Sequence, residues 1–589
     1  MKRILCLLLL LCSAFPMLAK PAKPGKIRHT QPDGSVIEMV KHGDEWGPFL
    51  TNTAGQVLRL DADGFYRVAK DVTPRAAARA LAVRRQARRQ AMARMQAGQT
   101  QIGFGQKRFL VILVEFQDVQ FILESPHETI SRMLNEPGFA DGGATGSARD
   151  YYYDNSRGVF DPVFDVFGPV LLSHDMAYYG GNDNRGEDMR PEEAVLEGCT
   201  LLDGEIDFSQ YDNDGDGEVD LVFMYYAGYS EADTIYTDAI WPHRWWLSYS
   251  GHTGPEVLLD GVILDNYACG SELCGAGVLD GIGTVCHEFG HVLGLPDFYD
   301  TNYSDDGETH GLSYFSLMDM GSYNNNNNTP PYLNAEERMI AGWMDPADMQ
   351  EFSQNGEYNL PSISENRAYK IPADQEGEYF VLECRDGQGW DSELYGAKGL
   401  LVYHVDKSER KVGYFSARRL WEEWRTTGNA INALGSHPCF YLIPAADQNN
   451  LDYKVEYLSD LQKIPFPGMA GVTRYSPVSW NQVETDVRLS DITFADNQSR
   501  FTVGGIAPGR LDFPYIANPG RGSYAAGSSF PLEVVMPEGQ ELQSVRWKLD
   551  GKGVSGSSVD LPAGSHTLEA NVTLADGKSY QVKLELKAQ

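Results

Sequence analysis

The sequence predicts a multidomain protein in which an α/β domain over residues 106–350 is followed by β-sandwich domains over residues 351–507 and 508–589. The length of 589 residues suffices for several domains, and 42% of the residues are hydrophobic, which is enough to fill their cores. Apolar runs at 109–118 and 220–228 predict buried strands, and a helical pattern covers 281–295. After residue 350, short alternating strands separated by Gly and Asp predict the sandwiches. This composition excludes a mainly disordered chain.

Residues 1–19 have the pattern of a secretory signal peptide. Lys2 and Arg3 precede a short apolar run, and Ala19 offers a small residue for cleavage. A buried N-terminal helix and a lipoprotein signal through Cys12 are the alternatives. No later segment is long and apolar enough to cross a bilayer. The sequence therefore predicts an extracellular protein, either free or at the cell surface.

Residues 20–105 are predicted to form a removable pro-segment. Within them, residues 74–98 favour a helix and carry seven arginines without an acidic residue: Arg75, Arg79, Arg84, Arg85, Arg88, Arg89 and Arg94. The rest of the chain is acidic, with a net charge of −33, so this segment would be held to an acidic partner domain. It would also offer cleavage sites to an activating protease across 75–94. The alternative is a solvated basic helix.

The acidic balance also limits the partners of the protein. A net charge of −33 argues against binding to nucleic acid, because phosphates would be repelled, and it suits binding of hard cations. Six of the eight cysteines would remain after signal removal, and an exported protein can form disulfides. We expect Cys269 with Cys274 and Cys384 with Cys439, or buried thiols as the alternative.

The chemistry of the chain is concentrated in the segment GIGTVCHEFGHVLGLPDFYD, which begins at Gly281. His287 and His291 are four residues apart, so a helix would present both imidazoles on one face, where they can bind Zn²⁺. Zn²⁺ lowers the pKa of a bound water toward neutrality. Glu288, between the two histidines, would be the general base. The alternative is a pair of hydrogen-bonded core histidines.

A third zinc ligand is predicted shortly after the histidine pair. Gly294 allows the helix to stop and the chain to turn, and Asp297 follows at the spacing of a third ligand in an extended zinc motif. A structural carboxylate that caps the turn is the alternative for Asp297. Glu336 and Glu337 are the rival ligands, as in enzymes that draw a glutamate from a later helix.

Two residues further along are predicted to support the zinc site. Met318, in SLMDMGSY, would form a methionine-containing turn beneath the metal. Tyr323 would donate a hydrogen bond to a developing oxyanion, although a packing role is the stronger interpretation.

A second cation site is predicted in YDNDGDGEVD. Its carboxylates are Asp212, Asp214, Asp216 and Asp220. The first three occupy alternating positions of a calcium loop, Gly217 follows at the sharp turn, and Asp220 stands at position 9. Phe223 stands where a complete loop has a bidentate Glu, so we expect a structural Ca²⁺ rather than a sensor. A solvated acidic turn is the alternative.

Several segments resemble the immune-inhibitor-A family of secreted bacterial zinc metallopeptidases. They are CHEFGHVLGLPDFYD, SLMDMGSY, FLVILVEFQD, YYYDNSRGVFDPVFDVFGPV, DGDGEVDLVFMYYAG, IWPHRW and ECRDGQGWDSELYGAKGLLVYHVD. The resemblance spans residues 25 to 505. It departs from the family at Asp319 and Met320, where small residues are usual, and at Tyr225 and Tyr226, where a histidine is frequent.

This resemblance implies a metzincin-like α/β zinc peptidase domain made as a zymogen. It implies that His287, His291 and Asp297 bind zinc and that Glu288 is the general base. Residues 508–589 lie outside the shared region and look like an immunoglobulin-like accessory domain. The sequence therefore predicts a secreted zinc endopeptidase acting on proteins or peptides. A secreted adhesin or glycan-binding protein with a vestigial zinc helix, and a calcium-dependent surface scaffold, are the alternatives.

Overall fold

The computed structural model describes residues 18–44, 48–61, 63–69, 102–183, 186–250, 257–301, 309–422, 430–505, 514–516, 523–536 and 540–588. Within the part described, no helix has the length and apolar character to cross a membrane. The predicted signal residues 1–17 and the arginine-rich helix at 74–98 lie outside the described residues.

The chain divides into two compact units. The first unit takes in the chain up to Met344 together with Gly387–Leu394 and Arg419–Pro438, and the second holds the remainder. The sequence predicts that the α/β domain ends at residue 350. In the structure, the chain leaves the first unit after Met344 and returns to it twice. Trp390 shows why it returns, because its indole Nε1 donates a 2.9 Å hydrogen bond to Asp154 of the first unit.

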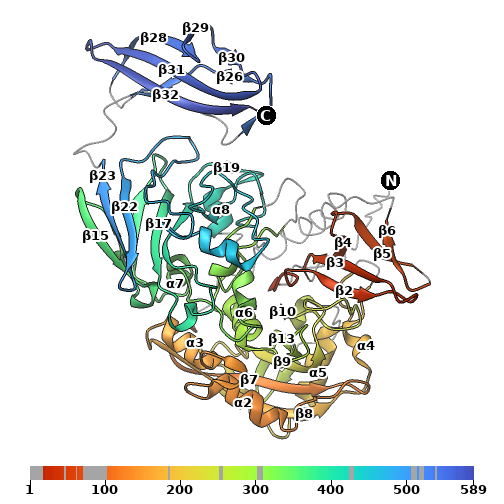
Figure 1. Ribbon diagram of the computed structural model, residues 1–589. Coiled ribbons are helices and arrows are strands. Elements are labelled where there is room, and N and C mark those ends of the chain that lie inside the picture. Colours follow the sequence, from red (N-terminus) through yellow and green to blue (C-terminus); the bar gives the residue numbers. More distant parts are fainter. Residues whose placement is uncertain are drawn as a thin grey trace, which may run out of the picture. The chain divides into compact units, whose positions relative to one another are not determined.

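The first unit is built on a six-stranded sheet (Figure 1). Its strands, in spatial order, are β1 (Leu18–Ala19), β10 (His243–Trp246), β13 (Asn266–Leu273), β9 (Val222–Tyr229), β7 (Gly105–Glu115) and β8 (Phe160–Leu171). The strands from β13 to β8 are parallel, whereas β10 and β1 run antiparallel to their neighbours. The predicted strands at 109–118 and 220–228 are confirmed as β7 and β9.

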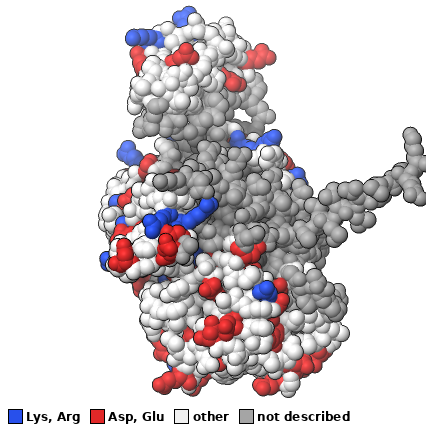
Figure 2. Space-filling view, turned by 90° about the vertical axis from the view of Figure 1, so that its right-hand side faces the viewer, with Lys and Arg blue, Asp and Glu red and all other residues white. Residues whose placement is uncertain are grey.

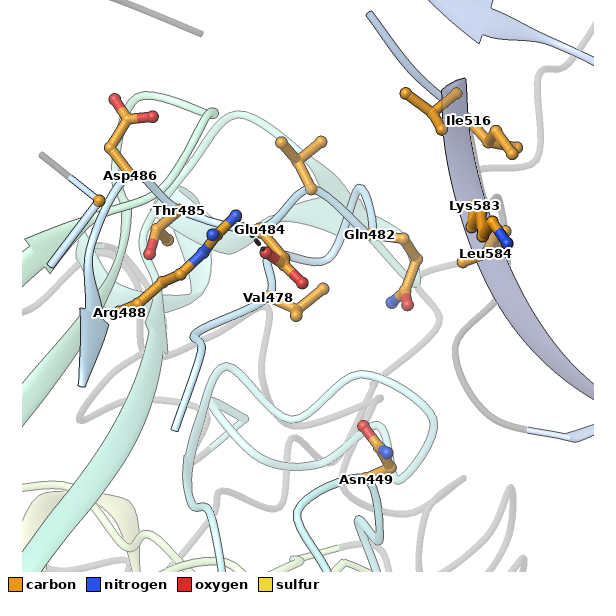
Figure 3. A pocket seen from close by; sticks show the side chains of 13 residues that line it. Asn449, Val478, Gln482, Glu484, Thr485, Asp486, Arg488, Ile516, Lys583 and Leu584 are labelled. Carbon is orange, nitrogen blue, oxygen red and sulfur yellow. Dashed lines mark hydrogen bonds and ion pairs between the residues drawn. The ribbon is translucent and has the colours of Figure 1, made fainter. Parts of the chain in front are cut away.

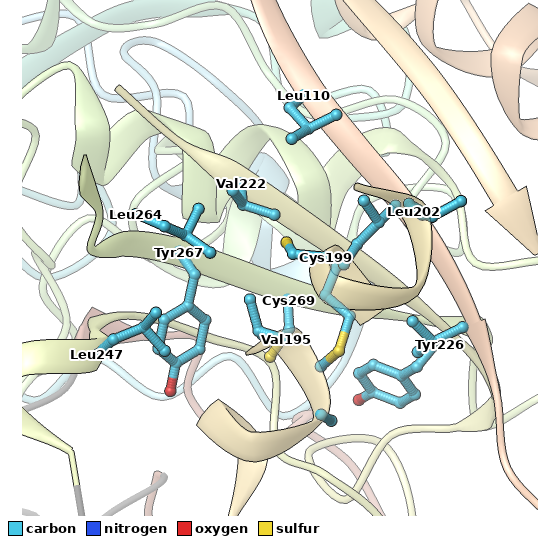
Figure 4. Packing of buried hydrophobic residues seen from close by; sticks show 14 of the residues in the cluster. Leu110, Val195, Cys199, Leu202, Val222, Tyr226, Leu247, Leu264, Tyr267 and Cys269 are labelled. Atoms are coloured by element: carbon cyan, nitrogen blue, oxygen red, sulfur yellow. The ribbon is translucent and has the colours of Figure 1, made fainter. Parts of the chain in front are cut away.

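Helices cover both faces of this sheet. The described helices of this unit up to Met344 are α2 (Pro126–Asn135), α3 (Ala148–Asn155), α4 (Met176–Gly180), α5 (Pro191–Leu202), α6 (Ile282–Val292) and α7 (Ala335–Ile340), and α2, α3, α5 and α6 contact the strands. On one face, Leu110 of β7 packs in a cluster with Val195 and Cys199 of α5 (Figure 4). On the other face, the ring of Phe109 lies 4.6 Å from that of Phe289 in α6. Burial on both faces explains why the central strands β7 and β9 carry almost continuous apolar runs.

The N-terminal residues form a separate antiparallel sheet within the first unit. Its strands are β2 (Ile27–Thr30), β3 (Val36–His42), β4 (Phe49–Asn52), β5 (Val57–Leu60) and β6 (Tyr66–Val68), paired in sequence order. A hairpin of β11 (Val257–Leu259) and β12 (Val262–Leu264) completes the strands of this unit. The N-terminal sheet lies within the predicted pro-segment.

The second unit is mostly β. One sheet has the order β14 (Met349–Glu351), β16 (Ala368–Pro372), β17 (Glu378–Arg385), β18 (Gly399–Asp406) and β21 (Phe440–Leu442). A second sheet contains β15 (Gly356–Pro361), β23 (Gln498–Gly504) and β22 (Arg488–Ala495), and one apolar cluster joins residues of both sheets. Smaller elements are β19 (Lys411–Val412) and β20 (Phe415–Ser416). Helix α8 (Ala417–Glu422) follows them where the chain returns to the first unit at Arg419.

The last residues of the second unit have an apolar core of their own. A five-stranded sheet has the order β25 (Ser523–Tyr524), β32 (Ser579–Ala588), β31 (Gly564–Leu574), β28 (Leu542–Leu549) and β29 (Lys552–Val554). Two short pairs accompany it, β26 (Ser529–Pro531) with β30 (Ser558–Asp560) and β24 (Tyr515–Ile516) with β27 (Val534–Val535). Phe530, Trp547 and Leu568 pack between these strands.

The surface follows the acidic composition of the chain. On the face drawn in Figure 2, the Lys and Arg side chains are interspersed with Asp and Glu. A pocket in the second unit is lined by residues that include Gln482, Glu484, Arg488 and Lys583 (Figure 3). Arg488 donates a 3.1 Å hydrogen bond to Glu484, but both side chains are more than half exposed, so the pair stabilises the fold little.

The predicted disulfides are wrong. The six cysteines after the signal are all described, all buried, and none is in a disulfide. Cys269 lies in the core within β13, whereas Cys274 follows the end of that strand. Cys384 is in β17 and Cys439 directly precedes β21, with β18 between these strands. Two strand spacings amount to about 9–10 Å, beyond the reach of a disulfide.

Candidate metal centre

The predicted zinc helix is α6, and all eleven of its residues are buried. Small residues allow this close packing: a Cβ on Gly283 would lie 2.0 Å from the carbonyl oxygen of Ser322. His287 and His291 lie one turn apart on the same face, with ring centroids 4.8 Å apart. The helix ends as the sequence predicts, because Gly294 has a φ of +87° and the chain turns there.

Backbone carbonyls fix the tautomer of both histidines. Nδ1 of His287 donates to the oxygen of Leu317 at 2.9 Å, and Nδ1 of His291 donates to that of Leu295 at 2.8 Å. A carbonyl oxygen only accepts, so each proton is on Nδ1 and each Nε2 offers a lone pair. Burial lowers the pKa of His291 to about 3, which keeps its ring neutral. Such hydrogen bonds orient imidazoles for a metal.

Asp297 reaches the same point from the turn after α6. Its Oδ1 lies 3.2 Å from Nε2 of His287 and 3.5 Å from Nε2 of His291, and all three side chains are fully buried. Ligands on a tetrahedral Zn²⁺ are separated by about 3.3 Å, given metal–ligand distances near 2 Å. Within the described residues, neither histidine Nε2 has a hydrogen-bond partner. The three atoms therefore fit a divalent cation held among them.

Glu288 points into the same site from α6. One of its oxygens, Oε1, accepts a 3.2 Å hydrogen bond from the backbone nitrogen of Lys20, and Oε2 has no partner among the described residues. Burial raises the pKa of Glu288 well above its usual value, and the charge of Asp297 adds to this effect. A general base needs a carboxylate oxygen that can accept a proton, and the position of Oε2 in the site suits that role.

Met318 lies directly against the zinc helix. A Cβ on Gly290 would lie 2.9 Å from its Sδ, so glycine at that position leaves room for the thioether. The Met318 side chain is fully buried, and its carbonyl accepts a hydrogen bond from the backbone of Phe298 at 2.9 Å. This contact joins the predicted methionine turn to the segment that carries Asp297.

The other candidates near the zinc site have different contacts. Glu337, a rival ligand, caps α7 through Asn334 and accepts a hydrogen bond from Ser316. Glu336 is buried in the same helix. The hydroxyl of Tyr323 donates to the backbone oxygen of Pro21 at 2.6 Å. That contact holds a bound peptide segment, and the oxyanion role stays a prediction.

The aspartate loop brings three of its four predicted carboxylates together. Oxygens of Asp212, Asp214 and Asp216 lie within 4.8 Å of one another. Asp220 is turned to Asn213, whose backbone and side-chain nitrogens donate to it at 2.9 and 2.6 Å. Burial raises the pKa of Asp220 to about 6. A cation in this loop would therefore be held by the first three carboxylates.

The N-terminal segment enters the candidate metal site, and the sequence did not predict this contact. Leu18 and Ala19 pair antiparallel with Arg244 and His243 of β10, extending the sheet by one strand. The backbone oxygen of Lys20 accepts a 2.9 Å hydrogen bond from the indole of Trp241. These contacts join residues more than 200 positions apart, and no local pattern encodes them.

The segment that carries this site is similar to a known protein family. Residues 97–339 match the sequence profile described as the catalytic domain of immune inhibitor A peptidase M6. The resemblance seen in the sequence extended further, over residues 25 to 505. The matched segment contains α6, Asp297, Met318 and the aspartate loop.

Two curated relatives match part of the chain. The pre-pro-metalloprotease PrtV of Vibrio cholerae serotype O1 is 31% identical over 259 residues, covering 37% of this chain and 28% of the relative. Immune inhibitor A of Bacillus thuringiensis subsp. alesti is 28% identical over 258 residues, covering 37% of this chain and 36% of the relative. The chain thus spans about a third of the length of either relative.

A solved structure, OgpA from Akkermansia muciniphila in complex with an O-glycopeptide, aligns over 84% of this chain and 98% of its own. With 10% identity and a TM-score of 0.20, that alignment carries no argument about this protein. The family profile is more informative: over residues 97–339 the chain is similar to the catalytic domain of the immune inhibitor A peptidases of family M6.

Proposed function

We propose that the protein is a secreted zinc-dependent endopeptidase, synthesised as a zymogen. The observation that carries this proposal is the convergence of His287 Nε2, His291 Nε2 and Asp297 Oδ1 at distances of 3.2 and 3.5 Å, beside the carboxylate of Glu288. When bound, Zn²⁺ would supply a Lewis acid for the substrate carbonyl and for water. An adhesin or scaffold would not need a buried proton-accepting carboxylate beside such a site.

Glu288 would move the proton during peptide hydrolysis. It would take a proton from the attacking water and deliver it to the leaving nitrogen of the substrate. The position of its Oε1, 3.2 Å from a backbone nitrogen of the bound N-terminal segment, supports this assignment. The edge strand β10 would align the substrate, because Leu18–Ala19 already pair with it as an added strand.

Two finer parts of the predicted fold belong to this proposal. A metzincin-like arrangement is supported by Met318 beneath α6 and by the antiparallel edge strand β10 beside the site. An immunoglobulin-like C-terminal domain is supported by the apolar core that strands β24–β32 share.

Latency is supported by the N-terminal segment, which fills the site. Lys20 covers Glu288, and cleavage after Ala19 would make the nitrogen at this point the amino terminus. Lys41 anchors the following sheet, since its buried Nζ donates to the carbonyl oxygen of Glu231 at 2.6 Å and contacts its carboxylate at 3.2 Å. Cleavage in the arginine-rich segment 75–94 would cut the chain between these anchors and the catalytic domain, so that the N-terminal segment could dissociate.

Casein digestion tests the proposed function. The secreted full chain should be inactive as purified, and should hydrolyse casein after limited trypsin treatment followed by a serine-protease inhibitor. A zinc chelator should abolish this activity, and added Zn²⁺ should restore it. Activity that survives the chelator, or no activity after the pro-segment is removed, would contradict the proposal.

The aspartate loop is proposed to bind a structural Ca²⁺. Binding to the native state alone would raise the melting temperature by about 5 °C at saturating Ca²⁺. Thermal unfolding with and without Ca²⁺, at constant Zn²⁺, would measure this shift. The double substitution Asp212→Asn and Asp214→Asn should remove it, because the loop loses two carboxylates that lie within 4.8 Å of Asp216. An equal shift in this variant would exclude the loop as the site.

A further inference from the structure

The side chain of Lys20 is buried in a pocket next to the zinc site. Its Nζ donates a 2.8 Å hydrogen bond to Oγ1 of Thr284, one helical turn before His287 on α6. The same ammonium lies 3.8 Å from the centre of the Tyr323 ring. The residue is 1% exposed, so the pocket encloses the whole side chain. The catalytic domain therefore already binds one basic side chain at this place.

The backbone around Lys20 lies as a substrate would lie. Before the predicted signal cleavage removes them, Leu18 and Ala19 form a strand on β10, and beyond Lys20 the carbonyl of Pro21 is held by Tyr323 at 2.6 Å. The nitrogen that contacts Glu288, at 3.2 Å, belongs to Lys20. In hydrolysis, the group that receives the proton from the general acid is the nitrogen after the scissile bond. Lys20 thus occupies the position of the residue that follows that bond.

Acidic side chains line the pocket. One oxygen of Asp280 accepts from Oγ1 of Thr284 at 2.7 Å, and the other accepts from the amide of Asn327. Asp233 accepts from Lys23 at 3.3 Å through Oδ2, while its buried Oδ1 has no partner among the described residues. Burial, the largest effect, lowers the pKa of Lys20, and the charges of both carboxylates act against it in favour of the ammonium. The pocket is therefore complementary to a cation.

The charges of these groups depend on the bound lysines. Burial raises the pKa of Asp280 to about 6. Burial also acts to raise the pKa of Asp233, but the charges of Lys20 and Lys23 outweigh it and hold this pKa below its usual value. When the pro-segment leaves, both carboxylates lose their partner cations in a buried place. An uncompensated buried charge is costly, and a basic side chain of a substrate would remove that cost.

We propose that this pocket selects a basic side chain, lysine above all, at the residue that follows the scissile bond. This inference rests on the proposed function and adds its substrate class. The mature enzyme would cleave proteins on the N-terminal side of lysine. Lysine fits best because the pocket closes around an ammonium with Thr284 as its direct acceptor.

A peptide panel tests the proposal. The secreted full chain is loaded with Zn²⁺ and activated with trypsin, which is then inactivated with a serine-protease inhibitor. It is given quenched fluorescent peptides that differ only in the residue after one bond: Lys, Arg, Met, Leu or Glu. We expect kcat/KM for Lys to exceed that for Met by about 100-fold, because a site built for a polar group discriminates strongly. Mass spectrometry should locate the cleavage before the lysine.

Two substitutions test whether the preference for lysine depends on the acidic residues of this pocket. Asp280→Asn and Asp233→Asn should each reduce the Lys-to-Met ratio by about tenfold or more, since each removes one buried charge facing the ammonium. Asp203→Asn removes an equal charge from an exposed position and should keep the wild-type ratio. If a pocket variant fails to fold, the wild-type panel still decides.

The outcomes separate this inference from the function it rests on. Cleavage of the panel with equal rates, or with a preference for Leu or Met, would overturn the basic pocket and leave the peptidase intact. An unchanged Lys-to-Met ratio in both pocket variants would also overturn it. Failure to cleave any peptide or casein would overturn the proposed function, and the pocket assignment with it.

Discussion

Replacement of Glu288 by Gln is expected to lower peptide hydrolysis about 1,000-fold while zinc stays bound. The loss follows from the removal of proton transfer, which contributes about 10²–10⁴ in rate. Zinc should remain because its three predicted ligands do not include Glu288. Asp297 Oδ1 lies 3.2 Å from Nε2 of His287 and 3.5 Å from Nε2 of His291. Metal analysis and casein hydrolysis of the activated protein would measure both effects.

Glu205→Gln is the matched control for this variant. Glu205 is exposed, so the same change of charge should leave activity and zinc content as in the wild type. Wild-type activity in Glu288→Gln would show that Glu288 is not the general base. Loss of zinc in Glu288→Gln would indicate that Glu288 is a ligand rather than the base.

Replacement of Asp297 by Asn is expected to weaken zinc binding by more than about 100-fold. Asn keeps the shape of the side chain but removes the charge that faces both imidazoles, and even partners outside the ligand set change metal affinity by 10- to 100-fold. Zinc affinity would be measured by competition with a chelator of known affinity, and activity should fall in parallel.

The rival ligand provides the control for Asp297. Glu337→Gln should keep zinc, because Glu337 is bonded to Asn334 and Ser316. It should lower stability by about 1 kcal/mol, since a helix cap is lost. Tight zinc binding in Asp297→Asn together with loss of zinc in Glu337→Gln would show that Glu337 of α7 is the third ligand.

The parts of the site that depend on local spacing could be predicted from the sequence. His287 and His291 share a face because four residues make about one helical turn. Asp297 follows a glycine that must turn the chain, and Gly294 indeed has a φ of +87°. Strands β7 and β9 were recognisable because burial on both faces requires continuous apolar runs.

The parts that depend on distant contacts could not be predicted. The contact of Lys20 with Glu288 spans 268 positions. Its only sequence signal is that Lys20 would follow the predicted signal cleavage after Ala19. The disulfide prediction failed for a related reason, because an even number of cysteines in an exported chain says nothing about which thiols meet. Likewise, no pattern indicates that Trp390 returns to the first unit to bind Asp154.

The most direct test of the central claim is zinc K-edge X-ray absorption on the purified, activated protein. The account predicts one zinc per chain, with two imidazole nitrogens and a carboxylate oxygen near 2 Å among its ligands. Asp297→Asn should change this spectrum, and Glu337→Gln should not. A protein without zinc, or a spectrum with sulfur ligands or without imidazole, would contradict the site built on His287, His291 and Asp297.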